Sequence, residues 1–451
     1  MYQFDKRRAS IPRPTRTAKD IDARALASYL SSRIDGEVRF DAGSRAIYST
    51  AASNYRQVPI GVVIPRDAED IEAAMEGCRR FGAPVLFRGG GTGLSGQTVN
   101  VAVVMDISKY MRGILSLDPI NRRARVQPGV VLDQLRTEAG KHQLTFGPDP
   151  STHTHNTLGG MIGNNSCGTH SVMAGRTVDN VYELEILTYD GLRMRVGPTS
   201  EAELDSLSRL GGRRGEIYAA LRKLRDKYAG SIRERFPNIP RRVSGYNLDE
   251  LLPEKGFNVA RALVGTEGTC VAVLEATVRL IESPRMTSLL VLGFPDIFTA
   301  GDYAPECMRY GPNACEALDD RLIEFNRIKH QHLRNMSLLP QGGGWLMVEF
   351  GGDNKEESDA KARRLMADMA RKPNAPSMKL FDDPQEEISL WKVRESGLGA
   401  TAWIPGHPAS WPGWEDSAVP PEKVGPYMRD LRKLFDRYGY ECALYGHIGQ
   451  G

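Results

Sequence analysis

The segment that says most about the fold of this chain and its ligand is Ala83-Pro-Val-Leu-Phe-Arg-Gly-Gly-Gly-Thr-Gly-Leu-Ser-Gly96. An apolar run opens it, and five glycines follow within the eight positions 89–96. Glycine buries almost nothing and loses the most conformational entropy on folding, so this density does not serve packing. A glycine-rich loop lets successive backbone N–H groups turn toward one anion. The loop therefore predicts a phosphate or pyrophosphate site.

Three kinds of loop compete for this segment. A P-loop ends in Gly-Lys-Ser/Thr, which is absent here. Gly91, Gly93 and Gly96 fit G-x-G-x-x-G, but that fingerprint needs a helix that starts at the loop. Residues 97–105 instead predict a strand, because valines alternate there. A loop between two strands disfavours the Rossmann interpretation and leaves a plain glycine-rich hairpin as the alternative.

Two further segments carry a resemblance to a known family. They are Phe146-Gly-Pro-Asp-Pro-Ser-Thr152 with Thr157-Leu-Gly-Gly-Met-Ile-Gly-Asn-Asn-Ser-Cys-Gly168, and Gly265-Thr-Glu-Gly-Thr269. Together with the first loop, and in this order, they resemble the PCMH-type FAD-binding domain of the vanillyl-alcohol oxidase / glycolate oxidase family. The resemblance covers roughly residues 55–450. Within the family, the chain resembles the D-lactate and D-2-hydroxyglutarate dehydrogenases that carry a fused iron–sulfur region.

The resemblance implies that backbone amides and side chains of all three segments bind FAD. The implied contacts are Arg88, Gly89, Gly90, Gly91, Thr92, Gly93, Leu94 and Ser95; then Pro148, Asp149, Ser151, Thr157, Gly159, Gly160, Gly163, Asn164, Ser166 and Gly168; and finally Glu267 and Gly268. Relatives with covalently attached flavin often carry His where Thr92 stands, so we expect dissociable FAD. His153 and His155 are either candidate tethers or ordinary polar loop histidines.

Local patterns predict an α+β fold with no appeal to family. Asp67 can cap a helix that ends at Gly82, because Ile71, Ala74 and Cys78 recur on one face. Strands and helices then alternate irregularly, which disfavours a doubly wound sheet. The predicted elements are strands at 60–64, 85–87, 123–126 and 181–188, and a helix at 131–142.

We expect three regions along the chain. Residues 1–54 form a leader with a helix at about 20–33, and residues 55–284 form the two-subdomain FAD-binding domain. Residues 285–451 begin with a strand at 288–294, and they resemble an incomplete α/β, ferredoxin-like substrate cap. In that cap we also expect a helical stretch at 318–334, a strand at 345–350 and a helix at 356–371.

Arg394 is the candidate for holding a substrate carboxylate. It lies in Trp391-Lys-Val-Arg-Glu395, which resembles the family's Trp-x-x-Arg-Glu motif, and a bidentate guanidinium suits a planar carboxylate. The alternative is a surface arginine paired with Glu387 or Glu395. Leu398 stands where the 2-hydroxyglutarate enzymes place Thr, which leaves recognition of a second carboxylate open. Residues 415–420 match the family's strand that re-enters the active site.

The final residues, Tyr445-Gly-His-Ile-Gly-Gln-Gly451, resemble the family's Gly-His-x-Gly-Asp-Gly stretch, with Gln450 in place of Asp. The resemblance implies that His447 binds a divalent metal such as zinc. One histidine does not make a zinc site, which takes three protein ligands, so His447 would be part of a site completed in a longer protein. We therefore expect that the chain is a truncated form, with the electron acceptor or iron–sulfur region beyond residue 451.

Composition excludes several classes of protein. Charged residues make up 25% of the 451 residues and the net charge is only +3, so no basic surface for nucleic acid is indicated. No apolar run reaches transmembrane length, and no signal-peptide core follows Met1. Six cysteines without a C-x-x-C pair suit a reducing cytoplasm. We expect a cytoplasmic protein, either free or held peripherally at the inner membrane.

The expected activity is FAD-dependent oxidation of a D-2-hydroxy acid, of the D-lactate or D-2-hydroxyglutarate class, to the 2-oxo acid by hydride transfer to flavin N5. We expect the chain as it stands to bind FAD but to be impaired in turnover. Two alternatives remain. One is a flavin oxidoreductase of the same fold that acts on an alcohol or sugar, and the other is a non-catalytic FAD-binding module.

Overall fold

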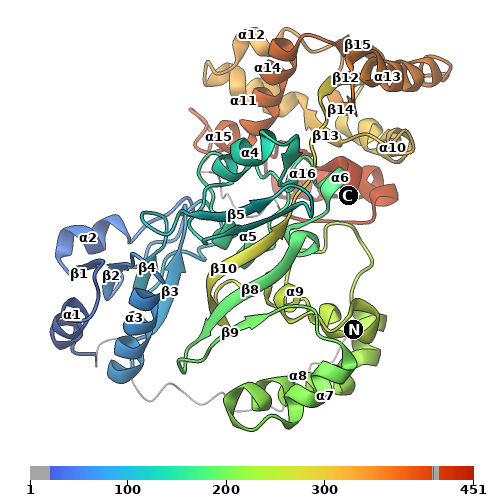
Figure 1. The fold of residues 1–451 in the computed structure, drawn as a ribbon. Coiled ribbons are helices and arrows are strands. Elements are labelled where there is room, and N and C mark those ends of the chain that lie inside the picture. The colour runs from blue at the N-terminus through green and yellow to red at the C-terminus, as the bar shows by residue number, and fades with distance from the viewer. Residues whose placement is uncertain (1–20, 409, 411–415) are drawn as a thin grey trace.

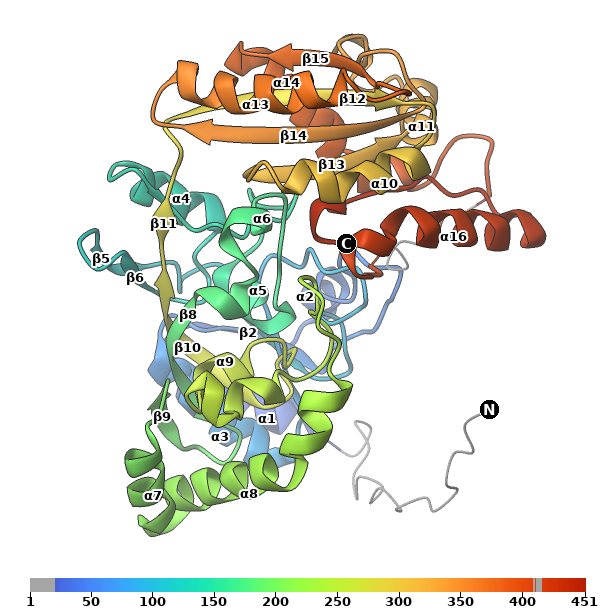
Figure 2. The same cartoon turned by 90° about the vertical axis from the view of Figure 1, so that its right-hand side faces the viewer.

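The computed structural model describes residues 21–408, 410 and 416–451. Residues 1–20 of the expected leader and Glu415 lie outside the described residues. Figures 1 and 2 show two sheets in the N-terminal part of the chain and a third, with its helices, stacked above them. We call the residues from 286 onward the cap. The mixed α+β class predicted from the sequence is confirmed.

The first sheet has the strand order β1-β2-β4-β3. Its strands and helices are β1 (Glu37–Arg39), β2 (Gly61–Ile64), β3 (Val85–Arg88), β4 (Val103–Asp106), α1 (Ala23–Ser31), α2 (Ala42–Ile47) and α3 (Ala68–Phe81). The predicted helix is α3, where Asp67 accepts from the backbone N–H of Asp70 at 2.9 Å and Gly82 is the left-handed C-cap. Ile71, Ala74 and Cys78 are fully buried, as the spacing predicted.

The predicted strand over 97–105 is wrong in extent, because β4 begins only at Val103. Val99 is buried but Val101 is 40% exposed, so the alternating valines do not share one face. β3 and β4 are parallel neighbours, joined by a loop with no helix in it. A hairpin joins antiparallel strands, so the plain hairpin is excluded along with the Rossmann helix.

Part of the predicted leader packs on the first sheet. β1 pairs antiparallel with β2, and α1 lies against α3. Leu26 and Leu30 of α1 are fully buried in the same core as Ile71. Residues between Ala23 and Phe40 therefore contribute to the first core, while domain boundaries at 54 and 284 stay predictions.

The second sheet is antiparallel, in the order β5-β6-β10-β8-β9. Its region contains β5 (Ile114–Asp118), β6 (Arg123–Val126), α4 (Leu132–Gly140), β7 (Leu144–Thr145), α5 (Leu158–Asn164), α6 (Ser171–Ala174), η2 (Thr177–Asn180), β8 (Val181–Thr188), β9 (Arg193–Val196), α7 (Glu201–Arg209), α8 (Gly212–Arg235), η3 (Leu248–Leu251), η4 (Pro253–Lys255), α9 (Val259–Leu263), β10 (Val271–Arg279) and β11 (Ile281–Glu282). β6 and β8 have the predicted bounds, and α4 lies within the predicted helix. The sheet and its helices bury one common core.

The cap contains an antiparallel sheet in the order β15-β12-β14-β13-β16. Its elements are β12 (Met286–Phe294), α10 (Ile297–Met308), β13 (Ala314–Asp319), α11 (Asp320–Ile328), α12 (Leu333–Met336), β14 (Gly344–Gly352), α13 (Lys355–Met369), β15 (Ser377–Phe381), α14 (Pro384–Glu395), α15 (Gly397–Thr401), η5 (Pro421–Lys423), α16 (Val424–Tyr438), β16 (Tyr445–Gly446) and η6 (Ile448–Gln450). From β12 to β15 this is the β-α-β-β-α-β order and strand arrangement of a ferredoxin-like fold, as predicted.

Both faces of the cap sheet are covered. One face buries Leu290, Leu292 and Val348 with residues of α10, α13 and α16. The other buries Leu289 and Met347 with residues of α11, α12, α14 and α15. The second of these faces carries the polar groups of the candidate site.

Two predicted cap elements differ from the structure. Residues 416–420 form no strand, and the last strand of the chain is the short β16. The backbone N–H of Leu444 donates to the Asp319 carboxylate at 2.7 Å, so it bonds to a side chain rather than to a neighbouring strand. The helical stretch at 318–334 is broken into α11 and α12, since His330 and His332 adopt positive φ. None of the described helices combines the length and apolarity needed to cross a membrane.

Candidate functional site

The first two predicted flavin segments lie close against each other. A Cβ added at Gly89 would meet Thr157 Oγ1, and one at Gly90 would meet the carbonyl oxygen of His155. Both contacts would be closer than the 3.0 Å that real Cβ atoms keep. The first loop can therefore approach the second only because it carries glycine at these positions.

The third segment is hydrogen-bonded to the second. The backbone N–H of Gly265 donates to the Ile162 carbonyl at 2.8 Å, and that of Glu267 donates to the Gly163 carbonyl at 2.9 Å. Ile162 and Gly163 belong to α5, whose N-cap is Thr157. The structure thus brings together all three segments that the sequence singled out.

The first loop keeps its backbone donors free. From Gly89 to Leu94, no backbone N–H has a hydrogen-bond acceptor among the described residues. Burying such donors without a partner is costly, and a run of them turned to one side is what a phosphate or pyrophosphate needs. These residues fit the pyrophosphate of FAD.

Two of the predicted FAD contacts use their side chains to brace the loops. Arg88 Nη1 donates to the Thr50 carbonyl at 2.9 Å, and the guanidinium lies 5.2 Å from the ring centre of Tyr48. Asp149 accepts from the backbone N–H of His170 at 2.7 Å, and its other oxygen lies 2.5 Å from His170 Nδ1. Direct contact of these two side chains with FAD stays a prediction.

The predicted FAD contacts differ in exposure. Most of them, including Pro148, are partly or fully buried in the loops and α5. The exposed ones are Gly90, Ser95, Ser151, Gly160, Glu267 and Gly268, and they come from all three segments. Exposed groups around a buried framework are what a ligand-binding surface requires.

The two candidate tether histidines have other contacts. His153 Nδ1 lies 2.7 Å from Asp133 Oδ2 of α4, and His155 Nδ1 lies 2.6 Å from Thr154 Oγ1. Both pairings match the interpretation as polar loop histidines.

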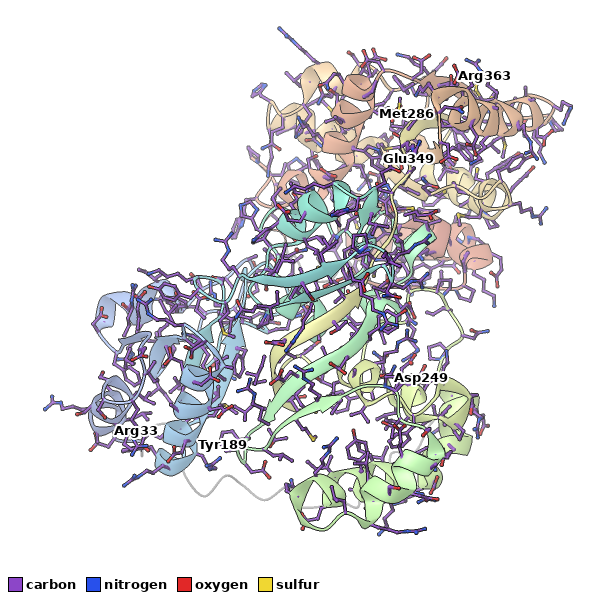
Figure 3. The ribbon with its side chains drawn as sticks, in the orientation of Figure 1. Arg33, Tyr189, Asp249, Met286, Glu349 and Arg363 are labelled. Carbon is purple, nitrogen blue, oxygen red and sulfur yellow. The ribbon has the colours of Figure 1, made fainter. Side chains whose placement is uncertain are left out.

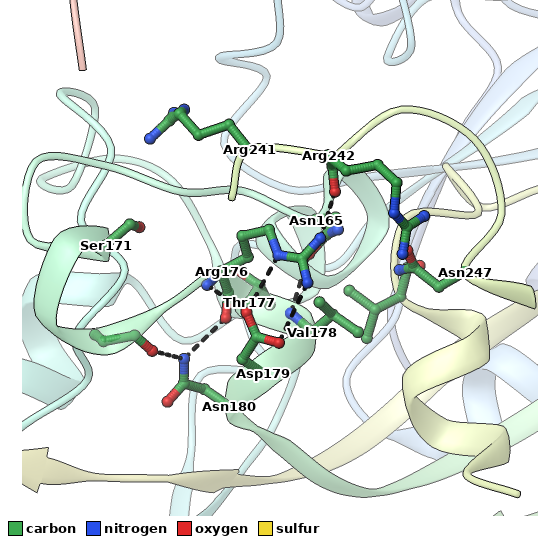
Figure 4. A network of polar contacts seen from close by, with 12 residues as sticks. Asn165, Ser171, Arg176, Thr177, Val178, Asp179, Asn180, Arg241, Arg242 and Asn247 are labelled. Carbon is green, nitrogen blue, oxygen red and sulfur yellow. Dashed lines mark hydrogen bonds and ion pairs between the residues drawn. The ribbon is translucent and has the colours of Figure 1, made fainter. Parts of the chain in front are cut away.

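A polar network holds the end of the second loop, as Figure 4 shows. Asn165 Oδ1 accepts from the backbone N–H of Val178 at 3.0 Å. Arg176 Nε lies 3.2 Å from Asp179, and its Nη1 donates to the Arg242 carbonyl at 2.5 Å. The network ties the second loop to the segment before η3, which gives the loop a stable backing.

The substrate candidate Arg394 lies inside the cap, next to a buried acid. Its Nη2 is 2.7 Å from Glu316 Oε2, and Glu316 Oε1 is 2.7 Å from His447 Nδ1. Glu316 has no exposed side-chain surface, and that of Arg394 is 9% exposed. The Arg394 guanidinium also lies 5.1 Å from the ring centre of Tyr445, while its Nε has no hydrogen-bond acceptor in the described structure.

Burial and charge act against each other in this cluster. Burial alone would raise the pKa of Glu316, but the charges of His447 and Arg394 hold that pKa below its usual value. Burial lowers the pKa of His447, although Glu316 opposes that shift. Glu316 is therefore the anion that keeps the Arg394 cation in place.

The surface alternative for Arg394 is wrong, since its ion-pair partner is Glu316 rather than Glu387 or Glu395. Glu316 was not predicted. The only signal in the sequence was a single acid inside the apolar run 314–318, a position where a charge needs a partner.

The C-terminal residues connect the cap to α6, which follows the second flavin segment. Gln450 Nε2 donates to the Ser171 carbonyl at 2.8 Å, and Gln450 Oε1 accepts from Arg241 Nη1 at 3.1 Å. Gln450, which stands where relatives have Asp, thus binds the N-terminal part of the chain.

The residues around His447 do not fit a metal ion. Within the part of the chain that the structure describes, no three His, Cys, Asp or Glu side chains are grouped as ligands. His447 has one such neighbour, Glu316, which is also the partner of Arg394. We derive no step through a metal.

Comparisons with known proteins agree with this architecture. Residues 59–197 match the family described as FAD binding domain, and residues 283–451 match FAD linked oxidases, C-terminal domain. The D-2-hydroxyglutarate dehydrogenase of Pseudomonas putida is 30% identical over 437 residues, which cover 94% of this chain and 43% of that protein. The D-lactate dehydrogenase of Archaeoglobus fulgidus is 28% identical over 417 residues, covering 92% and 77% respectively.

A solved structure has the same fold. Alkyldihydroxyacetonephosphate synthase matches with a TM-score of 0.58 at 16% identity, over 84% of this chain and 68% of that one. This chain spans less than half the length of the Pseudomonas putida relative. The chain belongs to the FAD-linked oxidase family, with a PCMH-type FAD-binding domain followed by the family's C-terminal domain, and FAD is the cofactor that this membership implies.

Proposed function

We propose that this chain carries out FAD-dependent oxidation of a D-2-hydroxy acid, of the D-lactate or D-2-hydroxyglutarate class, to the 2-oxo acid. The observation that carries the proposal is the buried Arg394, held by Glu316 on the cap face where Glu349 lies. That face is linked to Asp149 of the second flavin segment through His170. The names of the two relatives, a D-2-hydroxyglutarate and a D-lactate dehydrogenase, support the same substrate class.

Arg394 would bind the substrate carboxylate. Its guanidinium offers more donors than the ion pair needs, since Nη2 faces Glu316 while Nε has no acceptor in the described structure. A planar carboxylate can take two parallel N–H donors of one arginine, which also sets its orientation. Glu316 would keep the guanidinium in one place, so the substrate Cα has a defined position.

The glycine loop and its two companion segments would hold FAD without a covalent bond. When bound, FAD supplies the two-electron acceptor for the oxidation. We propose that the electrons then leave to an acceptor outside these 451 residues, and that these residues alone turn over slowly. The six cysteines of the described chain are unpaired, and the sequence has no C-x-x-C pair.

Anaerobic mixing of the FAD-loaded protein with candidate substrates tests the proposal. We expect bleaching of the visible flavin band by D-lactate or D-2-hydroxyglutarate, and not by their L-enantiomers. In Arg394→Lys the concentration for half-maximal bleaching should rise about 10- to 100-fold, because Lys keeps the charge but cannot bind bidentately. Bleaching by a sugar or an alcohol, unaffected by Arg394→Lys, would favour the alternative oxidoreductase.

A further inference from the structure

A second buried carboxylate lies on the same face of the cap sheet as Glu316. Glu349 of β14 is 5% exposed, and Figure 3 labels it on the side of the cap toward the FAD-binding domain. Its Oε1 lies 2.9 Å from His170 Nε2, and its Oε2 accepts from Trp391 Nε1 at 3.2 Å. Glu349 thus joins a residue of the FAD-binding domain to a residue of α14.

His170 connects this carboxylate to the second flavin loop. Its Nδ1 lies 2.5 Å from Asp149 Oδ2, and its backbone N–H donates to the other oxygen of the same carboxylate. Burial alone would lower the pKa of His170, but Asp149 and Glu349 raise it well above 6.5. An imidazolium bridging two carboxylates satisfies all three groups, because both ring nitrogens are then donors.

The two buried cap carboxylates, Glu316 and Glu349, have similar surroundings. Glu316 is opposite Met347 in the β13–β14 pair, and Glu349 is two residues further along β14, so both acids point to one face. α14 supplies a partner to each, Arg394 for Glu316 and Trp391 for Glu349. Trp391 and Arg394 are three residues apart, so they lie on the same side of the helix.

We propose that His170 is a positioning residue for the proposed reaction. Bridging Asp149 and Glu349, it holds the cap against the second flavin loop and so sets where Arg394 lies relative to the flavin. The effect on substrate oxidation rests on the proposed function, whereas the contact between the second flavin loop and the cap does not. His170 itself need touch neither substrate nor FAD.

Other charged groups lie near both ends of the bridge. Arg136 of α4 acts electrostatically on Asp149, and Asp149 acts on Glu395 of α14. Glu349 acts on Glu387, also of α14. Removing the imidazolium therefore leaves two buried carboxylates, Asp149 and Glu349, without their shared cation. Two unpaired buried carboxylates repel each other or draw in water, and either effect loosens the contact between the second flavin loop and the cap.

The test compares His170→Gln with His142→Gln, a matched change at an exposed histidine that lies outside the three flavin segments. In the FAD-loaded protein, kcat/KM for D-2-hydroxyglutarate and D-lactate should fall about 10- to 100-fold in His170→Gln, mainly through KM. Bound FAD should stay stoichiometric. Amide hydrogen exchange should accelerate in α14 and β14 in His170→Gln alone.

The double variant His170→Gln/Glu349→Gln separates positioning from general damage. It removes one of the two stranded carboxylates, so exchange in α14 should return part of the way to the wild-type rate. If the wild type oxidises no 2-hydroxy acid, the proposed function fails, and the exchange data still decide whether the bridge exists. Exchange in α14 that is the same in His170→Gln and His142→Gln would overturn the proposal, as would an unchanged KM in an active enzyme.

Discussion

Arg394 of α14 and Glu316 of β13 form a 2.7 Å ion pair in the interior of the cap, where Glu316 is completely buried. A buried acid of this kind is tolerated only with a partner, and each partner of Glu316 lies at a different place in the sequence. The pair thus makes the position of a potential substrate-binding cation depend on the whole cap sheet.

Removing Arg394 should affect stability as well as binding. Arg394→Ala leaves Glu316 buried with His447 as its remaining partner, which should cost about 3–5 kcal/mol of the free energy of unfolding. Urea denaturation checks this value. Lys392→Ala, at an exposed position on the same helix, is the control and should change stability by less than about 0.5 kcal/mol. Equal stability of the two variants would contradict the buried ion pair.

A methyl group in the first loop should weaken FAD binding. Gly90→Ala places a Cβ against the backbone carbonyl of His155, which cannot rotate away, so the loop must shift. The dissociation constant for FAD, measured by flavin fluorescence, should rise about tenfold or more, equivalent to about 1.4 kcal/mol.

The control for this change is Gly230→Ala in α8, where an added Cβ meets nothing within 4 Å. That variant should bind FAD like the wild type and be more stable by about 0.5–1 kcal/mol, because alanine is the better helix former. Unchanged FAD affinity in Gly90→Ala would show that the first loop is not the cradle.

Stability should depend on pH through His170. Its pKa is above 6.5 in the folded protein, so the folded state binds the proton more tightly than the unfolded state does. The resulting stabilisation is complete below pH 6.5 and is lost as the pH rises through the folded-state pKa. The difference in free energy of unfolding between wild type and His170→Gln should therefore shrink with rising pH. A difference independent of pH above 6.5 would be inconsistent with a bridging imidazolium.

The mode of flavin attachment can be read from denatured protein. Thr92 stands where a tethering histidine would be expected, and His153 and His155 have polar partners. Precipitation with acid should therefore release the yellow colour into the supernatant. Colour that stays with the precipitate would mean a covalent bond to the flavin.

Local patterns in the sequence predicted much of the fold, but they could not predict contacts between residues far apart in the sequence. The Asp67 cap, the apolar face of α3 and the Gly82 stop are all encoded within one short run of neighbouring positions, and the structure has them. In the cap, local patterns predicted β12, β14 and α13 but not α10, β13 or β15, and the ferredoxin-like arrangement was implied by the family resemblance. The prediction of a strand over 97–105 was wrong because alternating valines do not distinguish a strand from a loop in which single side chains are buried.

The candidate site likewise contains residues that short motifs predicted and residues that only long-range contacts reveal. Sequence reasoning singled out the three segments that the structure brings together and the buried Arg394, since each lies in a short motif; their contacts with FAD and substrate stay predictions. It missed Glu316, His170 and Glu349, because their bonds join residues far apart, such as the 179 positions between His170 and Glu349. A single buried acid in an apolar strand indicates that some partner exists, but only the folded chain identifies it.

We propose that this chain holds FAD and, through Arg394, the carboxylate of a D-2-hydroxy acid. Anaerobic titration of the FAD-loaded protein with D-2-hydroxyglutarate and D-lactate, followed by the flavin absorbance spectrum, decides whether it does. We expect a saturable change of the spectrum with at least one of these acids, shifted about 10- to 100-fold to higher concentration in Arg394→Lys. A spectrum that responds to neither acid, or responds equally in wild type and Arg394→Lys, would contradict it.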